Sequence, residues 1–338
     1  MTVLVTGAGG FLGRRIVDSL LRQGVTSVRV HARRAVPEEL LQGWRQAYPG
    51  AEVSVVLANL LSRGKLAHVV EGVDCIVHAA AGMKGAAADM FANTVLTTRN
   101  LLEAATAAHV RRIVLVSSFS VFDAAPLPKG SVLDERTPIE KVGVERGPYG
   151  YAKTRQEHLF NEFQRESGFE SVILRPGVIY GPGGGAMSSR VGIKAMGLFV
   201  SLGGSATLPL TYVDNCADAV ATAALKAPAG SVFSLVDDDL PTCSAYLQAY
   251  RKQVEPLRCI PLPYPLFMLA SRMLVWYHRR SKGQLPALFT PYVVASMYKP
   301  LRYSNQALRG IGWAPRVPTS EGLKRAFAHF REELQRKR

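Results

Sequence analysis

Short apolar runs alternate with helical patterns along the first half of the chain. Residues 3–5 form an apolar run that ends in glycines, and residues 12–21 then place apolar side chains at the three- and four-residue spacing of a helix. Strands that alternate with helices form parallel sheets with right-handed crossovers. The expected fold class is therefore α/β, a doubly wound parallel sheet. The same patterns predict further strands at 27–34, 53–57, 73–82, 112–118 and 231–236, and helices at 93–108 and 148–163.

The second half of the chain is less regular. Its residues 181–204 predict a mixture of loop and helix that lines a substrate pocket. A chain of 338 residues is long enough for one large α/β domain and a smaller one. We expect the large domain to comprise residues 1–180 and 209–237, and a smaller, mostly helical substrate-binding domain to comprise 181–208 and 238–338. The pocket candidates, each of which also suits an ordinary core position, are Met187, Met196, Phe199, Phe267, Met268 and Trp276.

Gly7, Gly10 and Gly13 stand between the first strand and the first helix. The first glycine permits a sharp turn, the second lets a pyrophosphate approach the backbone, and the third lets helix and strand pack closely. The phosphates then meet the free N–H groups of the helix N-terminus, where the helix dipole is positive. The large domain is therefore expected to be a dinucleotide-binding Rossmann domain.

Arg33 and Arg34 end the predicted second strand, where such a domain reads the adenosine ribose. A carboxylate at this place favours NAD, whereas an arginine accommodates the 2′-phosphate of NADP. The first acidic residue after the strand is Glu38. We therefore expect NADP(H) to be preferred, with NAD(H) as the alternative cofactor. The other interpretation is that the two arginines are only solvated, or stack on the adenine.

Tyr149 and Lys153 are four residues apart in the helix predicted after the fifth strand, so their side chains share one face. Tyr151 faces elsewhere, which makes Tyr149 the preferred residue. A nearby ammonium favours the phenolate and should lower the pKa of Tyr149, so that it can exchange a proton with a carbonyl or alcohol oxygen. The spacing alone is weak evidence for a catalytic pair. It becomes stronger evidence because the pair follows the glycine turn and a fifth strand that ends in Ser117 and Ser118.

Motifs along nearly the whole chain carry a family resemblance. They lie at residues 6–13, 78–81, 93, 100–104, 117–118, 149–153, 175–182, 212–215, 308–313 and 321–322. Together they resemble the extended short-chain dehydrogenase/reductase superfamily, which includes the NAD-dependent epimerases and dehydratases. The resemblance implies that Ser118 hydrogen-bonds the reacting oxygen, that Tyr149 is the acid/base, and that Lys153 holds the nicotinamide ribose while tuning Tyr149. It also implies a homodimer formed through the helix of Tyr149 and Lys153.

The same resemblance implies a set of cofactor contacts at the ends of the predicted strands. Pro176, Gly177 and Val178 would border the nicotinamide, and the small residues 79–81 would leave room for the cofactor across the sheet edge. The complete set is Gly7, Gly10, Phe11, Leu12, Gly13, Arg33, Arg34, Asn59, Leu60, Ala79, Ala80, Ala81, Asn93, Ser117, Tyr149, Lys153, Pro176, Gly177 and Val178.

Several departures from the family pattern narrow the chemistry. Nucleotide-sugar epimerases usually carry an asparagine at the place of Val178 and a diphosphate-binding arginine at the place of Leu208. Residues 119–120 lack the carboxylate that dehydratases use. The other motifs most resemble the 3β-hydroxysteroid dehydrogenase-like branch, which handles apolar alcohols and ketones. Asn59 replaces an aspartate that usually faces the adenine amine, but its carbonyl oxygen can still accept that hydrogen bond.

The net charge of +15 is concentrated near the end of the chain, where residues 251–338 hold 17 Lys and Arg but only 4 Asp and Glu. The arginines are scattered and no nucleic-acid module is recognisable, so no nucleic-acid partner is expected. Residues 261–277 are unusually apolar, but they are too short for a membrane span and contain Arg272. Either this stretch packs within the substrate domain and walls an apolar pocket, or residues 261–282, which end at Lys282, touch an anionic membrane peripherally.

The four cysteines form neither a C-x-x-C pair nor a zinc spacing, so reduced thiols and no metal site are expected. The N-terminus enters a strand without a basic leader, which predicts a cytoplasmic protein, peripheral on the inner face of a membrane if residues 261–282 bind lipid.

The function that these patterns favour is an NADP(H)-dependent oxidoreductase. It would transfer a hydride between nicotinamide and a hydroxyl or ketone of a small apolar or lipid-like molecule, sterol-like or β-keto. The alternatives are a nucleotide-sugar epimerase or reductase, and a non-catalytic NADP-binding scaffold on the same fold.

Overall fold

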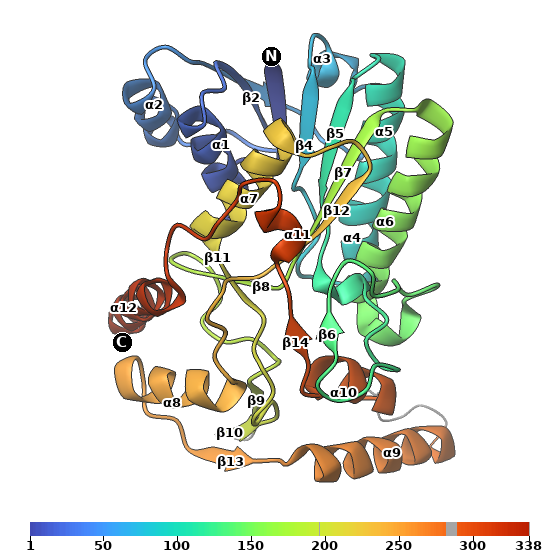
Figure 1. Cartoon of the computed structure of the whole chain (residues 1–338), viewed down its shortest axis with the longest axis vertical. Helices are drawn as coiled ribbons and strands as arrows, with labels where there is room; N and C mark the ends of the chain where they lie inside the picture. The colour runs from blue at the N-terminus through green and yellow to red at the C-terminus, as the bar shows by residue number, and fades with distance from the viewer. Residues whose placement is uncertain (196, 282–288, 338) are drawn as a thin grey trace.

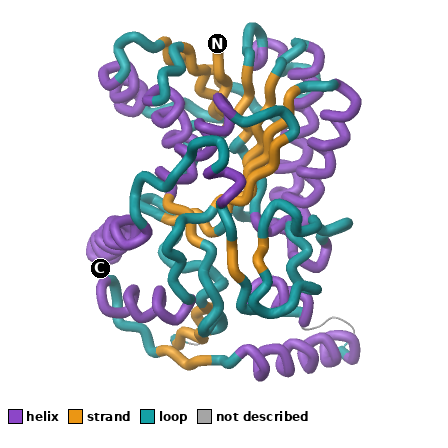
Figure 2. Tube along the Cα trace, viewed as in Figure 1, coloured by secondary structure: helices purple, strands orange, loops and turns teal. Residues whose placement is uncertain are grey.

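The computed structural model describes residues 1–195, 197–281 and 289–337. A seven-stranded parallel sheet forms the upper half of the molecule as drawn in Figures 1 and 2. The strand order is β12-β7-β5-β4-β1-β2-β3. The expected α/β class and doubly wound parallel sheet are confirmed, and the order reverses direction between β1 and β4. The strands are β1 (Thr2–Thr6), β2 (Ser27–Ala32), β3 (Glu52–Leu57), β4 (Cys75–His78), β5 (Arg112–Val116), β7 (Glu170–Pro176) and β12 (Ser231–Leu235).

Helices cover both faces of this sheet, and each face has its own apolar core. Val3 and Val5 of β1 point into one core, whereas Leu4 points into the other, because successive side chains of a strand face opposite sides. The first core packs against α1 (Gly13–Arg22), α2 (Glu38–Ala47) and α7 (Val213–Lys226). The second packs against α3 (Ala67–Val70), α5 (Thr97–Ala107) and α6 (Gly147–Ser167).

The helix expected at 93–108 begins earlier and is interrupted. The structure has α4 (Ala87–Phe91), then the π-helical turn η1 (Ala92–Leu96), then α5. A π-helical turn inside a helix is uncommon and often accompanies a functional site. The strands expected at 27–34, 73–82 and 112–118 are shorter in the structure, because their last residues leave the sheet at its carboxyl edge.

The expectation of loop and helix at 181–204 is wrong. This stretch contains two antiparallel strands, β9 (Gly192–Ala195) and β10 (Leu198–Ser201), and β10 also pairs with β13 (Cys259–Pro261). Gly197 lies between β9 and β10 with φ +75°, a conformation that side chains rarely adopt, so it turns the chain back into a hairpin.

The rest of the second half is mostly helical, as expected. A third core joins two short paired strands to the flanking helices through Tyr180, Tyr212, Tyr246 and Phe327. The elements are β8 (Val178–Tyr180), β11 (Leu210–Tyr212), α8 (Cys243–Gln253), α9 (Tyr264–Arg280), α10 (Pro291–Tyr298), α11 (Gln306–Arg309) and α12 (Thr319–Lys337), with β6 (Val132–Leu133) paired to β14 (Arg302–Tyr303).

The apolar stretch at 261–277 largely forms α9, which lies along the edge of the molecule (Figure 1). Its inner face packs through Phe267 on Leu202, Val294 and Tyr298, a separate cluster that we name the second-half core. This packing agrees with one of the two interpretations, whose apolar pocket stays a prediction. Its outer face is exposed. Among the described helices, none is long and apolar enough to cross a membrane. Lys282, the last residue of the stretch expected to touch a membrane, lies outside the described residues.

The pocket candidates fall into different environments. Phe199 and Phe267 are buried core residues, Met187 and Met268 pack against cores, and Trp276 is exposed at the surface. The interpretation of Trp276 as a pocket wall is therefore wrong. Met196 lies outside the described residues. All four cysteines are free thiols.

Candidate active site

The glycine turn has the close packing that its spacing predicts. Gly7 has φ +69°, and a Cβ on it would lie 3.1 Å from the Ala80 Cα atom. A Cβ on Gly13 would lie only 2.1 Å from the Gly7 carbonyl oxygen. Gly10 is exposed in the turn, three residues before α1 begins. The turn therefore leaves the backbone bare at the N-terminus of α1, which is what a pyrophosphate needs.

The expected cofactor residues from other strands lie at the same edge, because the carboxyl ends of parallel strands meet there. Arg33 and Arg34 follow β2 and are exposed. The Arg33 guanidinium donates a 2.9 Å hydrogen bond from Nη1 to Oδ1 of Asn93 in η1, so the structure brings two of these residues together. Asn59 is exposed after β3, and its Oδ1 already accepts from the Leu61 N–H at 3.1 Å.

The segments that follow β4 and β7 are held closely in place. Residues 79–81 are half-buried beside the glycine turn. The Gly177 N–H donates to the Leu235 carbonyl at 3.0 Å, and a Cβ on Gly177 would lie 2.3 Å from the Pro209 carbonyl oxygen. Pro176, Gly177 and Val178 therefore form a fixed link between β7 and β8. Leu60 is buried, whereas Phe11 and Leu12 are half-buried at the turn.

Ser118 and Tyr149 interact with each other. Ser118 follows β5 in an extended conformation, and its Oγ accepts a 3.1 Å hydrogen bond from the Ser120 N–H, so its own hydrogen remains available to donate. Tyr149 lies in the first turn of α6. Burial raises the pKa of the Tyr149 phenol, and the hydrogen bond with Ser118 opposes this shift. Tyr151 instead stacks on Phe91, with ring centroids 5.9 Å apart.

The pKa of Tyr149 is raised in this structure, whereas the spacing of Tyr149 and Lys153 predicted that it would be lowered. The Lys153 ammonium is buried and donates from Nζ to the Val116 carbonyl and to Oε1 of Gln156, each at 2.9 Å. Burial outweighs the opposing hydrogen bond with Ser118, so the pKa of Tyr149 moves upward. Burial also lowers the pKa of Lys153 to about 8, although the Glu157 carboxylate pulls it upward.

A buried polar chain connects Lys153 to the strand that precedes the glycine turn. Gln156 donates from Nε2 to Oγ1 of Thr98 at 2.8 Å, and the same oxygen lies 2.8 Å from Nε2 of His78. Nδ1 of His78 lies 2.8 Å from Oγ1 of Thr6. Burial, reinforced by the nearby Lys153 charge, lowers the pKa of His78 to about 3, so this ring is neutral. Sequence reasoning missed this chain, whose only signal is polar residues at inward positions.

Ser117 turns its side chain away from the cofactor edge. Its hydroxyl donates to Oε2 of Glu157 at 2.5 Å, and Glu157 forms a buried ion pair with Arg175. The Arg175 guanidinium also lies 4.8 Å from the centre of the Phe122 ring. Contact of Ser117 with a cofactor would therefore involve its backbone. Glu157 was also missed, although it stands one helical turn after Lys153.

Arg146 is a further residue that the sequence did not reveal. Its Nε donates to the Ser120 carbonyl at 3.1 Å, which fixes the segment after Ser118 to the residues before Tyr149. Burial and the nearby Arg190 charge lower the pKa of Arg146 to about 10. Within the described part of the chain, its buried Nη1 has no hydrogen-bond partner.

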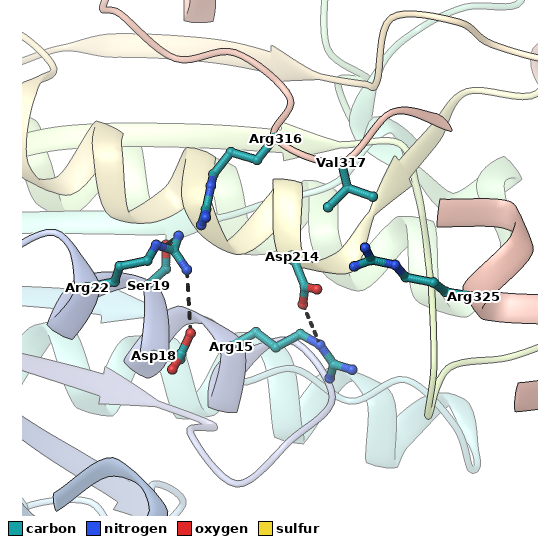
Figure 3. A pocket seen from close by; sticks show the side chains of 8 residues that line it. All are labelled: Arg15, Asp18, Ser19, Arg22, Asp214, Arg316, Val317 and Arg325. Carbon is teal, nitrogen blue, oxygen red and sulfur yellow. Dashed lines mark hydrogen bonds and ion pairs between the residues drawn. The ribbon is translucent and has the colours of Figure 1, made fainter. Parts of the chain in front are cut away.

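A cleft of about 420 Å³ is lined by none of these residues. Figure 3 shows the side chains that line it. It lies between α1, the start of α7 and the chain that leads into α12. Arg15 pairs with Asp214 at 2.8 Å and Arg22 pairs with Asp218, so ion pairs tie α1 to α7 beside the cleft. Because none of the expected catalytic residues lines the cleft and its ion pairs join α1 to α7, we assign it to domain packing. Its lining residues are Arg15, Asp18, Ser19, Arg22, Asp214, Arg316, Val317 and Arg325.

The edge that holds the glycine turn, Arg33, Asn93, Ser118 and Tyr149 combines a dinucleotide cradle with proton-donating groups. Its bare backbone fits a pyrophosphate, since a Cβ at Gly7 or Gly13 would fill the space that the turn needs. A phenol whose pKa is raised keeps its proton until a stronger base accepts it. The arrangement can therefore protonate an oxygen held between Ser118 and Tyr149.

Comparison with known proteins agrees with this geometry. The model of the NAD dependent epimerase/dehydratase family matches residues 3–235. The chain is 28% identical to the 2-alkyl-3-oxoalkanoate reductase of Stenotrophomonas maltophilia (strain K279a), over 97% of this chain and 99% of that protein. It is 25% identical to a decarboxylating sterol-4-alpha-carboxylate 3-dehydrogenase of Candida albicans, over 98% of each chain.

Solved structures share the fold at lower identity. The UDP-glucose 4-epimerase of Thermus thermophilus, solved in complex with NAD, superposes with a TM-score of 0.69 at 21% identity, over 98% of this chain and 99% of that one.

Proposed function

Because this chain belongs to the NAD-dependent epimerase/dehydratase family and is an enzyme of the extended short-chain dehydrogenase/reductase type, we propose that it is an NADP(H)-dependent oxidoreductase of apolar, lipid-like hydroxyls or ketones. The observation that carries the proposal is the contact between Ser118 and Tyr149 at the edge that also holds the glycine turn. The expected catalytic set, Ser118, Tyr149 and Lys153, is complete in this chain.

In the reductive direction, Ser118 and Tyr149 act on the substrate oxygen. A bound nicotinamide supplies the hydride to the carbonyl carbon. Ser118 donates a hydrogen bond to the oxygen as negative charge develops there, and Tyr149 donates both a hydrogen bond and then its proton. A phenol whose pKa is not lowered is protonated near neutral pH, so Tyr149 holds a proton when the substrate arrives.

Lys153 acts behind Tyr149. Its ammonium is held by the Val116 carbonyl and Gln156, one turn of α6 away from the phenol. A positive charge in that place stabilises the phenolate that remains after proton transfer. Lys153 would also hold the ribose of the bound cofactor.

Two apolar side chains and the names of two relatives support an apolar substrate. Leu208 is buried in the third core, and Val178 packs against that core. Neither side chain can therefore donate a hydrogen bond to a diphosphate. The names of the Stenotrophomonas reductase and the Candida dehydrogenase both describe carbon skeletons with an oxygen function at carbon 3. We therefore propose a sterol-like or β-keto compound as substrate.

The decisive test compares Tyr149→Phe with Tyr151→Phe. NADPH oxidation would be followed against a panel of steroids, β-keto acyl compounds and nucleotide sugars. Loss of general acid catalysis should lower kcat/KM by about 10²–10⁴ in Tyr149→Phe and leave NADPH binding intact. Tyr151→Phe should keep most of its activity, because Tyr151 packs on Phe91. Full turnover by Tyr149→Phe would refute the mechanism.

The same panel separates the alternatives. Turnover of nucleotide sugars, or protection against heat by UDP- or GDP-sugars but not by hydrophobic ketones, would favour an epimerase or a nucleotide-sugar reductase. Binding of NADPH without reduction of any member of the panel would favour a non-catalytic scaffold.

Preference for NADP(H) would rest on Arg33 and Arg34, which are exposed beyond β2. The double variant Arg33→Ala/Arg34→Ala should weaken NADPH binding about 10- to 100-fold, because hydrogen bonds to a charged phosphate are among the stronger ones. Binding of NADH should change about threefold or less. Equal losses for the two cofactors would contradict the preference and leave NAD(H) as the natural partner.

A further inference from the structure

The outer face of α9 is an unusually apolar part of the surface. Side chains that are 48–66% exposed recur along it at the spacing of one helical face. They are Leu266, Leu269, Met273, Trp276 and Tyr277. Ile260, on the neighbouring β13, is also half-exposed. Contiguous exposed apolar residues on a folded protein usually mark an interaction site.

The inner face anchors α9 to the second-half core, so the exposed side chains are not required for packing. Phe267 is buried, and its ring lies 5.1 Å from the Tyr298 ring and 5.4 Å from the Phe289 ring, measured between centroids. Ser271, one turn later, is also buried. The inner face therefore holds α9 in place, with its apolar outer face exposed to solvent.

The charge around this face has one sign. Arg272, Arg279 and Arg280 are exposed on α9, and no ion pair involves any of them within the described residues. Residues 256–320 contain no Asp or Glu at all. A second copy of this chain would bring like charges together, so self-association through α9 is unfavourable. The charge complements an anionic surface.

We propose that α9 docks the protein on the anionic surface of a phospholipid membrane. The helix would lie in the plane of the interface, with Leu269 and Met273 among the acyl chains and Trp276 at the level of the headgroups, which tryptophan favours. The arginines would extend their apolar stems and keep their guanidinium groups at the lipid phosphates. The position of α9 along one edge of the molecule leaves this face accessible (Figure 1). The inference is independent of the proposed reaction.

Tryptophan fluorescence gives a direct measurement. Trp44 and Trp313 are 4% and 2% exposed, whereas Trp276 is 66% exposed, so a change on addition of vesicles reports Trp276. Vesicles of phosphatidylcholine with phosphatidylglycerol should shift the emission to shorter wavelength, and brominated acyl chains should quench it. Pure phosphatidylcholine vesicles should bind much more weakly. Trp276→Phe should abolish the signal, while flotation shows that the variant still binds.

Matched variants separate the apolar and the charged contributions. Leu269→Gln/Met273→Gln should abolish flotation with anionic vesicles, whereas Val55→Gln, on the exposed side of β3, should not. Arg279→Gln/Arg280→Gln should weaken binding about thirtyfold, because each cation near an anionic surface contributes roughly fivefold. Arg251→Gln/Lys252→Gln, on α8, should bind like the original chain. Circular dichroism and NADPH binding would verify that each variant is folded.

Three results would overturn the proposal. The first is the absence of binding to anionic vesicles at low salt. The second is binding that Leu269→Gln/Met273→Gln leaves unchanged. The third is a dimer, seen by light scattering, that the same variant dissociates, because it would assign the apolar face to a second copy.

Discussion

Helices α6 and α9 depart from the usual pattern of burial in opposite directions. Helix α6 buries four polar residues, which are Lys153, Thr154, Gln156 and Glu157. The outer side of α9 leaves apolar side chains such as Met273 and Trp276 in contact with water. Buried polar groups and exposed apolar patches are the informative exceptions in a folded protein. The two helices therefore mark two different tasks.

The difference lies in how each exception is compensated. Lys153, Gln156 and Glu157 each have a hydrogen-bond partner inside the protein, because an unsatisfied polar group in the interior destabilises a fold. The apolar face of α9 has no such compensation within the described chain. The buried polar residues of α6 thus find their partners within the protein. The exposed apolar side chains of α9 need a partner from outside it.

Glu157→Ala should produce the largest effect, because it leaves the Arg175 charge buried without its partner. We expect the free energy of unfolding to fall by about 3–5 kcal/mol, measured by urea denaturation. Glu162→Ala, at an exposed position of the same helix, should change it by less than about 0.5 kcal/mol. Equal urea midpoints for Glu157→Ala and Glu162→Ala would show that the buried carboxylate stabilises the fold no more than the exposed one.

Gly13→Ala tests the packed half of the molecule at the glycine turn. A Cβ would lie 2.1 Å from the Gly7 carbonyl oxygen, so turn and helix must separate. We expect a loss of about 1–3 kcal/mol in stability and loss of NADPH binding, measured by calorimetry. Gly9→Ala is the control, because a Cβ there meets nothing within 4 Å. Normal cofactor binding by Gly13→Ala would refute the role of close packing.

Gln156 should set the pH at which Lys153 loses its proton. The pKa of Lys153 is lowered to about 8, so the rate of carbonyl reduction should fall as the pH rises through that value. Gln156→Leu removes an acceptor for the ammonium and should move this limb about one pH unit lower, whereas Gln156→Glu should move it higher. Identical pH–rate profiles for the three proteins would exclude a positioning role for Gln156.

The same pKa shift affects stability. The ordinary pKa of Lys153 is 10.5, so the unfolded chain holds this proton more tightly than the folded one. The contribution of Lys153 therefore destabilises the fold below about pH 8, and stability should rise as the pH increases from about 8 to 10.5. Urea denaturation across this range measures the slope, and Lys153→Met should reduce it.

The smallest effect is expected on the outer face of α9. Leu269→Gln/Met273→Gln should change the free energy of unfolding by less than about 0.5 kcal/mol, and should leave the turnover of a water-soluble ketone unchanged. Phe267→Ala, on the inner face, should lose about 3–5 kcal/mol. A large loss of stability in the outer variant would mean that these side chains support the fold, and α9 would then resemble α6.

Local patterns predicted the parts of the molecule that depend on near neighbours in sequence. The strands before Gly7 and Ser118 were predicted because a short apolar run is sufficient to indicate a buried parallel strand. The glycine turn was predicted because each of its glycines meets a steric requirement within the turn or next to it. The homodimer implied by the family resemblance stays a prediction.

Contacts between distant residues account for what could not be predicted. The hairpin β9–β10 was missed because a glycine such as Gly197 indicates only that regular structure is interrupted. Its left-handed conformation, which makes the turn between the two strands, is known only from the structure. The chain from Thr6 through His78 and Thr98 to Gln156 joins four elements that are separate in sequence. The direction of the Tyr149 pKa was wrong because burial dominates it, and burial depends on the whole fold.

The position of β12 in the sheet has a consequence for synthesis of the protein. β12 pairs with β7 at one edge of the cofactor sheet, yet it follows the β9–β10 hairpin in the chain. A ribosome that has not yet released residues 231–235 therefore carries a sheet whose β7 edge has no neighbour from this chain. Unpaired strand edges promote association with other chains. The β7 edge is therefore open to association with other chains until β12 has emerged.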